Sequence, residues 1–270
     1  MSATVAGSAA RVAAAHRTRP WTPAVLLLAA ALVVVFPGAT SASSAPPGGG
    51  TARVLLSVTD PGLSAATVAD RVLDAGGRVE AVLEVAGALV VDLPAGVAVP
   101  LGAVVVPDVA LRVNAAPAAL APAVAGGTYS STVGRVPGYD GSGVTVAVVD
   151  TGVADVADLA GRLRHINVSG GPQGDGLGHG TFVAGLVAGD GSSSDGTFTG
   201  VAPGARVLDV QVATADGTTS LSRVLAGLQA VADARDDDAS IAVLSLALSS
   251  GSPLPTAVDP LTRGLDRLWA

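Results

Sequence analysis

The stretch VTVAVVDTG, at residues 144–152, decides how the C-terminal half of this chain is interpreted. Val144 to Val149 forms an apolar run, which is typical of a parallel strand whose two faces are both covered. Asp150 follows at the carboxyl end of that strand, where the sites of parallel sheets form. A carboxylate that leaves an apolar strand is largely desolvated and needs a hydrogen-bonding partner. The alternative is a strand-end aspartate that only caps a turn.

The sequence GLGHGTFVAG, at residues 176–185, places His179 at the start of a helix. The turn before it is dense in glycine, so that backbone and ligand can approach closely. Its glycines fall at every second position, which forms neither G-x-G-x-x-G nor a P-loop, and a nucleotide-binding loop is excluded. Of the two other histidines, His16 lies near the N-terminus and His165 in a polar stretch without such surroundings. His179 is therefore the candidate catalytic histidine, and a structural histidine is the alternative.

The remaining segments after residue 144 alternate between strand and helix patterns. A helix is expected over 179–189, and an apolar stripe from Leu221 to Val231 predicts a second one, capped by Ser220 or Ser222. Apolar runs predict strands over 207–212 and 241–248. This alternation predicts an α/β fold with a mostly parallel sheet and flanking helices.

Composition removes several classes of function. The net charge of −7 offers no basic surface for nucleic acid. Cysteine is absent, which excludes thiol nucleophiles, disulfides and thiolate metal sites. Hydrophobic residues make up 49% of the chain and charged residues 14%, so that packed cores can form and wholesale disorder is not expected.

The N-terminal region, 1–42, has the pattern of a signal peptide. Three arginines precede an apolar run from Ala24 to Phe36, and the small residues 39–42 suit signal peptidase. The run is shorter than the roughly 20 apolar residues of a membrane span. We therefore expect export, with an uncleaved membrane anchor as the alternative.

A small α+β domain is expected over 51–114, and 115–143 is expected to be a linker rich in Ala, Pro, Gly and Ser. The domain begins with a strand over 53–58. A helix opens at Leu63-Ser64 and ends at Gly76-Gly77, with Ala65, Ala69, Val72 and Leu73 on one side. Two strands over 78–93, a short helix and a strand over 104–113 complete a split βαβ, or ferredoxin-like, order.

Three motifs together resemble one family. The Asp150 motif, the His179 motif and GVAPGA at residues 200–205 have the order and spacing of the subtilisin-like (S8) serine peptidases, and the resemblance runs from Val144 to the C-terminus. The expected subtilisin-like catalytic domain, 144–270, is incomplete. The segment 51–114 also resembles the inhibitor-type propeptide of these enzymes.

The resemblance implies roles for individual residues. Asp150 would orient the imidazole, and His179 would act as general base and then general acid. Gly217, Thr218 and Thr219 would pair with an extended peptide substrate. The strand that walls the pocket for the residue before the scissile bond would comprise Leu246, Ala247, Leu248 and Ser249, with Ser249 in place of the family's glycine.

Other positions depart from the family. Phe182 replaces a second histidine and is interpreted as core packing. Neither the family's oxyanion-hole Asn nor its Gly-Thr-Ser-x-Ala nucleophile motif occurs in the sequence up to Ala270. Ser220 mimics the latter but is better explained as a helix cap. We therefore expect an incomplete record or a gene fragment of a protease, inactive as it stands.

The leading hypothesis is a secreted serine endopeptidase precursor whose partners are polypeptide substrates and its own propeptide. The alternatives are a non-catalytic binding or inhibitory protein and a membrane-tethered protease. No cofactor is expected. Asp155 and Asp158 lie where some relatives bind calcium, so a calcium site is kept as an alternative. Isolated carboxylates after a strand are, however, usually solvated loop residues.

Overall fold

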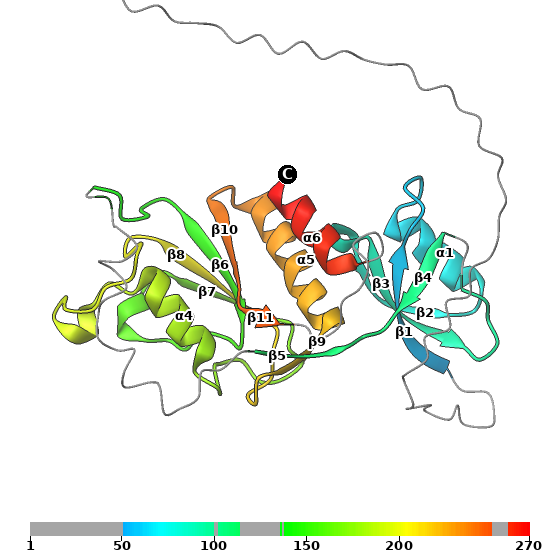
Figure 1. The fold of residues 1–270 in the computed structure, drawn as a ribbon, viewed down its shortest axis with the longest axis horizontal. Helices are drawn as coiled ribbons and strands as arrows, with labels where there is room; N and C mark the ends of the chain where they lie inside the picture. Colours follow the sequence, from blue (N-terminus) through cyan, green and yellow to red (C-terminus); the bar gives the residue numbers. More distant parts are fainter. Residues whose placement is uncertain (1–50, 100–101, 114–135, 137, 250–258) are drawn as a thin grey trace, which may run out of the picture. The chain divides into compact units, whose positions relative to one another are not determined.

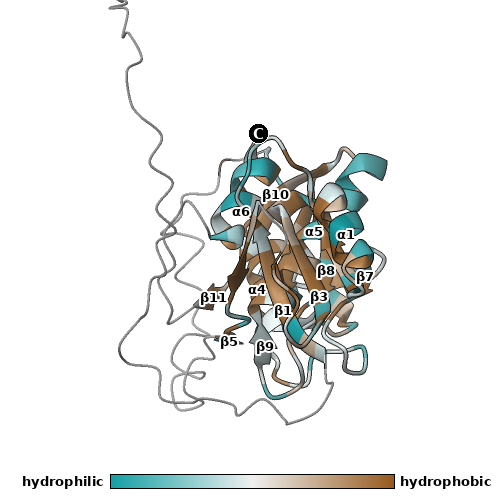
Figure 2. Cartoon of the chain, turned by 90° about the vertical axis from the view of Figure 1, so that its right-hand side faces the viewer, coloured by the Kyte–Doolittle hydropathy of each residue, from teal (hydrophilic) through white to brown (hydrophobic). Residues whose placement is uncertain are grey.

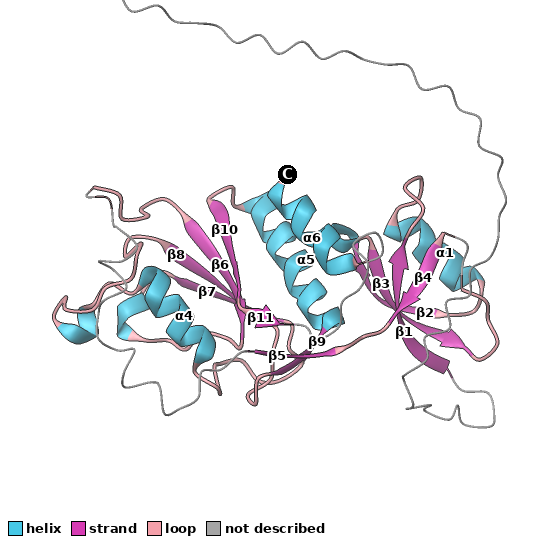
Figure 3. Cartoon of the chain, in the orientation of Figure 1, coloured by secondary structure: helices cyan, strands magenta, loops and turns pink. Residues whose placement is uncertain are grey.

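The computed structural model describes residues 51–99, 102–113, 136, 138–249 and 259–270 (Figure 1). The expected signal peptide and most of the expected linker lie outside these residues. The described part contains a four-stranded sheet near the N-terminus, a second four-stranded sheet and a three-stranded sheet (Figure 3). No helix in these ranges has the length and apolar character needed to cross a membrane.

The second sheet is parallel throughout, with the order β10-β6-β8-β7. Its strands are β6 (Thr145–Asp150), β7 (Leu163–Asn167), β8 (Arg206–Gln211) and β10 (Ile241–Leu246). Helices α4 (His179–Ala188), α5 (Leu221–Asp237) and α6 (Pro260–Trp269) accompany it, together with the short 3-10 helices η3 (Ala157–Leu159) and η4 (Ser192–Ser194). The predicted α/β class is confirmed.

Strand β6 lies inside the parallel sheet, and all six of its residues are buried. Successive side chains point to opposite faces of a strand. Ala147 and Val149 accordingly pack in the cluster that contains residues of α5. Val146 and Val148 pack in the cluster that contains Ala184 and Ala188 of α4. Apolar cover on both faces explains why the run is uninterrupted. In Figure 2 the strands are mainly brown and teal gathers on the helices.

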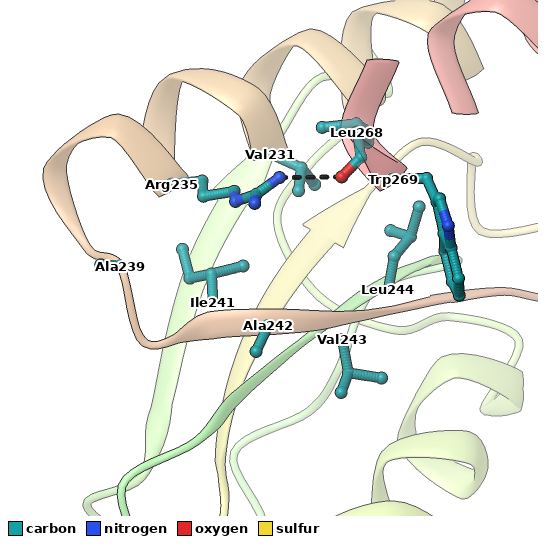
Figure 4. A pocket seen from close by; sticks show the side chains of 9 residues that line it. All are labelled: Val231, Arg235, Ala239, Ile241, Ala242, Val243, Leu244, Leu268 and Trp269. Carbon is teal, nitrogen blue, oxygen red and sulfur yellow. Dashed lines mark hydrogen bonds between the residues drawn. The ribbon is translucent and has the colours of Figure 1, made fainter. Parts of the chain in front are cut away.

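Strand β10 differs from the fully buried strand that was expected over 241–248. The strand ends at Leu246, and its residues Ala242 and Val243 are exposed. The reason is that β10 lies at the edge of the described sheet and pairs only with β6. A hollow of about 350 Å³ lies between β10 and the ends of α5 and α6, where Arg235 donates a hydrogen bond to the Leu268 carbonyl at 2.8 Å (Figure 4).

The N-terminal sheet has the order β2-β3-β1-β4, and its pairs are antiparallel, as in a split βαβ unit. Its elements are β1 (Thr51–Val58), α1 (Ala65–Asp74), β2 (Arg78–Leu83), the 3-10 helix η1 (Glu84–Ala86), β3 (Ala88–Pro94) and β4 (Ala103–Val106). Ser64 caps α1 by accepting a hydrogen bond from the Thr67 amide. Leu73 is 55% exposed, contrary to its predicted place on the packed side, whereas Val68 is buried there.

Two further expectations for this sheet are corrected. The short helix η1 connects β2 to β3, whereas a helix was expected after both strands. The strand expected over 104–113 is two strands in different sheets, because β5 (Ala110–Val113) leaves the N-terminal sheet after Pro107-Asp108. β5 lies between β9 (Thr218–Ser220) and β11 (Leu248–Ser249) in the three-stranded sheet.

The N-terminal sheet is covered on both faces. Residues such as Leu56, Leu89 and Val91 pack with the buried side of α1. On the other face, Leu55 and Val90 share a cluster with Leu225 and Leu228 of α5. Polar contacts reinforce this second face, since Gln229 accepts a hydrogen bond from the Val85 amide at 2.8 Å. Arg263 of α6 donates to the Val58 carbonyl and to the Ser57 hydroxyl.

Candidate active site

Asp150 and His179 meet at the carboxyl end of β6. The His179 Nδ1 atom lies 2.8 Å from Asp150 Oδ1 and 3.0 Å from Oδ2. Strand β6 ends with Asp150, and His179 is the first residue of α4. The Asp150 side chain is 1% exposed and the His179 side chain 14% exposed. The Thr151 amide also donates to Asp150 Oδ1, at 2.7 Å, so the buried carboxylate has the partners that it needs.

This contact determines which nitrogen of the neutral ring can accept a proton. A carboxylate only accepts hydrogen bonds, so Nδ1 of His179 must carry the hydrogen that it shares with Asp150. The other ring nitrogen, Nε2, is then left with its lone pair. The pair therefore has the arrangement of an oriented general base.

The glycines of the two motifs allow these segments to touch. A Cβ atom on Gly180 would lie 2.1 Å from the Gly152 carbonyl oxygen and 3.1 Å from the Asp150 Cβ. Gly152 has φ +106°, and a Cβ there would lie 2.7 Å from the Gly174 carbonyl oxygen. A side chain at Gly180 would therefore push α4 away from the end of β6, and one at Gly152 would collide with the loop at Gly174.

The segment expected to bind substrate is paired with a strand of the same chain. β5 runs antiparallel to β9, with Leu111 opposite Thr219 and Arg112 opposite Thr218. The Val113 amide donates to the Gly217 carbonyl at 3.1 Å. On its other side β5 pairs with β11, where Leu248 lies opposite Val113. Residues 110–113 thus occupy the place expected for an extended peptide.

The family comparison agrees with these motifs.

Residues 141–266 match the Subtilase family.

Part of this chain is similar to several known proteins. Serine protease AprX of Bacillus subtilis (strain 168) is 37% identical over 139 residues, which are 48% of this chain and 31% of that protein. Alkaline elastase YaB of Bacillus sp. (strain YaB) is 43% identical over 116 residues, 43% of this chain and 29% of that one. Subtilisin Savinase of Lederbergia lenta is 43% identical over 121 residues, 44% and 42% of the two chains.

A solved structure, that of a cold adapted subtilisin-like serine proteinase, is 27% identical with a TM-score of 0.37, over 48% of this chain and 45% of that one. The chain spans less than half the length of each of these four relatives.

The segment expected to wall the pocket, residues 246–249, is divided between two sheets. Leu246 ends β10 and lies opposite Val149 of β6. Ala247 separates the two strands, and β11 follows at Leu248 and Ser249, where it pairs with β5. In the turn that leads into β9, Gly217 has φ +76°, a backbone conformation that favours glycine. Three hydrogen bonds hold this turn and lower the pKa of Asp216 to about 2: one from the Thr214 hydroxyl, and two from the amide and hydroxyl of Thr218.

The structure tests the roles predicted for Ser220 and Phe182. The Ser220 hydroxyl accepts a hydrogen bond from the Arg223 amide at 3.4 Å and caps α5, which confirms the interpretation of Ser220 as a helix cap. The interpretation of Phe182 as a core residue is wrong, because its side chain is 53% exposed. It lies in the first turn of α4, on the side away from Ala184, which is buried.

Sequence reasoning missed a second histidine–aspartate pair, between β7 and β8. His165 Nδ1 lies 2.8 Å from Asp209 Oδ2, and its Nε2 lies 3.3 Å from Asp155. The two partners face each other in the β7–β8 ladder, and Asp209 is fully buried. A signal existed, since an aspartate inside the apolar strand VLDVQV requires a polar partner.

The described residues contain no group of three or more carboxylates, histidines or cysteines placed to hold a metal ion. Asp158, one of the two carboxylates considered for calcium, accepts hydrogen bonds from the Ser192 hydroxyl and the Ser193 amide at 3.1 and 2.6 Å. These bonds, with the Ser193 contacts contributing most, lower the pKa of Asp158 below its ordinary value. Asp155 contacts His165 instead.

Proposed function

We propose that this sequence belongs to a subtilisin-like serine endopeptidase that is exported as a precursor. The hydrogen bond between His179 Nδ1 and Asp150, at 2.8 Å, is the observation that carries the proposal. The match of residues 141–266 to the Subtilase family supports a serine peptidase. Export is proposed from the charged, apolar and small-residue pattern of 1–42.

The proposed reaction is acyl transfer from a peptide bond to a serine. His179 would take the proton of the serine hydroxyl at Nε2 as the oxygen attacks the carbonyl carbon, and would then deliver it to the leaving amine. Asp150 would hold the ring and stabilise the imidazolium. We propose that the full-length product supplies this serine and an oxyanion donor, and that Ser220 does not act as the nucleophile, because its hydroxyl caps α5.

We also propose that the chain inhibits itself through residues 51–113. Strand β5 pairs with Thr218 and Thr219 on one side and with Leu248 on the other, so a peptide substrate and β5 would compete for the same backbone groups. Cleavage between 114 and 143, followed by release of β5, would free these backbone groups for polypeptide substrates.

A fluorophosphonate probe tests the catalytic proposal, because it reacts covalently with an activated serine. We expect the full-length gene product to be labelled after cleavage between 114 and 143, and not before. Asp150→Asn should slow labelling by about 10⁴-fold, since the histidine loses its orienting partner. His179→Ala should have an effect of at least that size.

His165→Ala is the matched control, because it removes the other aspartate-bonded histidine, and it should leave labelling unchanged. Equal loss of labelling in His165→Ala and His179→Ala would contradict the assignment. A full-length product that resists the probe in every form, yet binds a protease tightly, would instead establish the non-catalytic binding protein.

A further inference from the structure

Asp175 lies between the two segments that carry Asp150 and His179. Its Oδ1 atom accepts hydrogen bonds from the Thr151 hydroxyl at 2.7 Å and from the Gly178 amide at 2.8 Å. Its Oδ2 atom accepts from the amide and the hydroxyl of Thr181, at 2.8 and 2.6 Å. One carboxylate thus binds the residue after Asp150, the residue before His179 and the second residue after it.

The two threonine hydroxyls extend this connection in opposite directions. Thr151 Oγ1 donates to Asp175 and accepts from the Gly180 amide at 3.0 Å, which ties the end of β6 to the start of α4. Thr181 Oγ1 donates to Asp175 and accepts from the Ala154 amide at 2.9 Å, which ties α4 back to the segment after β6. Two separate paths of hydrogen bonds through Asp175 therefore join the end of β6 to the start of α4.

The charge of Asp175 suits this role. Burial opposes ionisation, but the hydrogen bonds from Thr181, Thr151 and Gly178 outweigh it and lower the pKa of Asp175 below its ordinary value. An ionised carboxylate offers only acceptors to the four donors that converge on it. An asparagine amide would direct N–H groups at some of those donors.

We propose that Asp175 is a positioning residue, whose carboxylate fixes the Asp150 strand end against the His179 helix start. The reaction that it serves rests on the proposed function, whereas the geometry that it fixes does not. The four donors to Asp175 and the two threonine relays leave little freedom for α4 to slide along β6. The His179 ring is held at its backbone end by this network and at Nδ1 by Asp150.

Proton NMR of the 270-residue chain tests the proposal through the far-downfield signal of the His179 Nδ1–H. We expect Asp175→Asn to lose or broaden this signal. Asp158→Asn is the matched control, because Asp158 also tethers a loop through a hydroxyl and an amide but does not touch the catalytic segments. It should keep the signal. Retention of a sharp, unshifted signal in Asp175→Asn would overturn the proposal.

A second pair of variants covers the case in which Asp175→Asn does not fold. Thr151 is fully buried, and Thr151→Val keeps its shape while removing the hydroxyl that joins Asp175 to Gly180. We expect Thr151→Val to lose the Nδ1–H signal and Thr151→Ser to keep it. Equal signals in the two variants would also overturn the proposal.

Probe labelling of the full-length product separates this inference from the proposed function. We expect Asp175→Asn to slow labelling by about 10²-fold, as small misplacements of catalytic groups do, with Asp158→Asn unchanged. If no form labels while the NMR results are as expected, the proposed function fails and Asp175 remains a positioning residue for the pair. If the unaltered chain itself lacks the signal, the Asp150–His179 contact on which both proposals depend is absent.

Discussion

At the residue scale, the contact between Asp150 and His179 depends on a backbone approach that leaves no room for a side chain at Gly180. A methyl group there would lie 2.1 Å from the Gly152 carbonyl oxygen. We expect Gly180→Ala to move α4 away from β6 and to lower the free energy of unfolding by about 1–3 kcal/mol, the range for overpacking. Chemical denaturation measures the stability, and the Nδ1–H signal of His179 should disappear.

Gly185 provides the control for this prediction on the same helix. A Cβ at Gly185 would have no heavy atom within 4 Å. Gly185→Ala should therefore stabilise the helix by about 0.5–1 kcal/mol, through reduced freedom of the unfolded chain. Equal destabilisation by the two substitutions would contradict the close approach.

The His165–Asp209 pair makes stability depend on pH. Burial opposes the charge on His165, but hydrogen bonds to Asp209 and Asp155 and their negative charges outweigh it, so its pKa lies above the ordinary 6.5. Burial raises the pKa of Asp209, partly offset by its hydrogen bond with His165. Both groups bind protons more strongly in the folded state than in the unfolded state. Their contribution to stability is therefore lost as the pH rises through their folded-state pKa values, which lie above 3.8 for the Asp209 carboxyl and above 6.5 for the His165 imidazole.

The double variant His165→Gln/Asp209→Asn removes both titrations. We expect the melting temperature of the unaltered chain to fall relative to that of the double variant between about pH 5.5 and pH 8.5. A difference of about 1 kcal/mol corresponds to roughly 2–4 °C for a chain of this size. Parallel pH profiles of the two proteins would show that the pair does not titrate in this way.

At the element scale, β5 connects the N-terminal sheet with the candidate peptide-binding edge. Its Val113 amide donates to the Gly217 carbonyl, and Val113→Pro removes that donor. The loss of one hydrogen bond costs about 1–2 kcal/mol. We expect amides 218–220 to exchange with solvent about 5–30 times faster, the factor that corresponds to this energy, as measured by hydrogen–deuterium exchange.

Val113→Ala separates backbone from side chain, because it truncates the same residue and keeps the N–H group. We expect amides 218–220 to exchange with solvent more slowly in Val113→Ala than in Val113→Pro. Exchange that is equally fast in both variants would mean that side-chain packing, and not the ladder, holds β5.

At the scale of the whole molecule, one apolar cluster joins the N-terminal sheet to α5. Ala86 of η1 is fully buried in it and lies beside Gly264 of α6. Ala86→Gln would place an amide in this contact, and we expect a loss of about 1–3 kcal/mol in the free energy of unfolding. Faster hydrogen exchange in α6 should accompany the loss, because this surface would open.

Ala66→Gln is the control, because Ala66 lies on the exposed side of α1, the helix that covers the other face of the N-terminal sheet. Its effect should stay within about 0.5 kcal/mol, as for most surface substitutions. If Ala86→Gln is as mild as Ala66→Gln, the N-terminal sheet does not depend on the helices for its stability.

Features that depend on near neighbours in the chain could be predicted from its residues alone. The apolar run before Asp150 predicted β6, the glycines around His179 predicted the turn into α4, and Ser220 predicted a helix cap. Period, caps and turn residues act within a few positions of the chain, so they can be recognised without knowing the fold. The resemblance of the motifs to those of the subtilisin-like peptidases also implied that Asp150 and His179 would meet.

Features that depend on distant partners could be seen only in the folded chain. β5 joins β9 and β11 because its backbone groups find their partners more than 100 residues away, and β10 is half exposed because it lies at a sheet edge. The burial of Asp209 against His165 and the exposure of Phe182 follow in the same way from what covers each position. Pairing and burial are properties of the assembled layers, so residue patterns alone do not specify them.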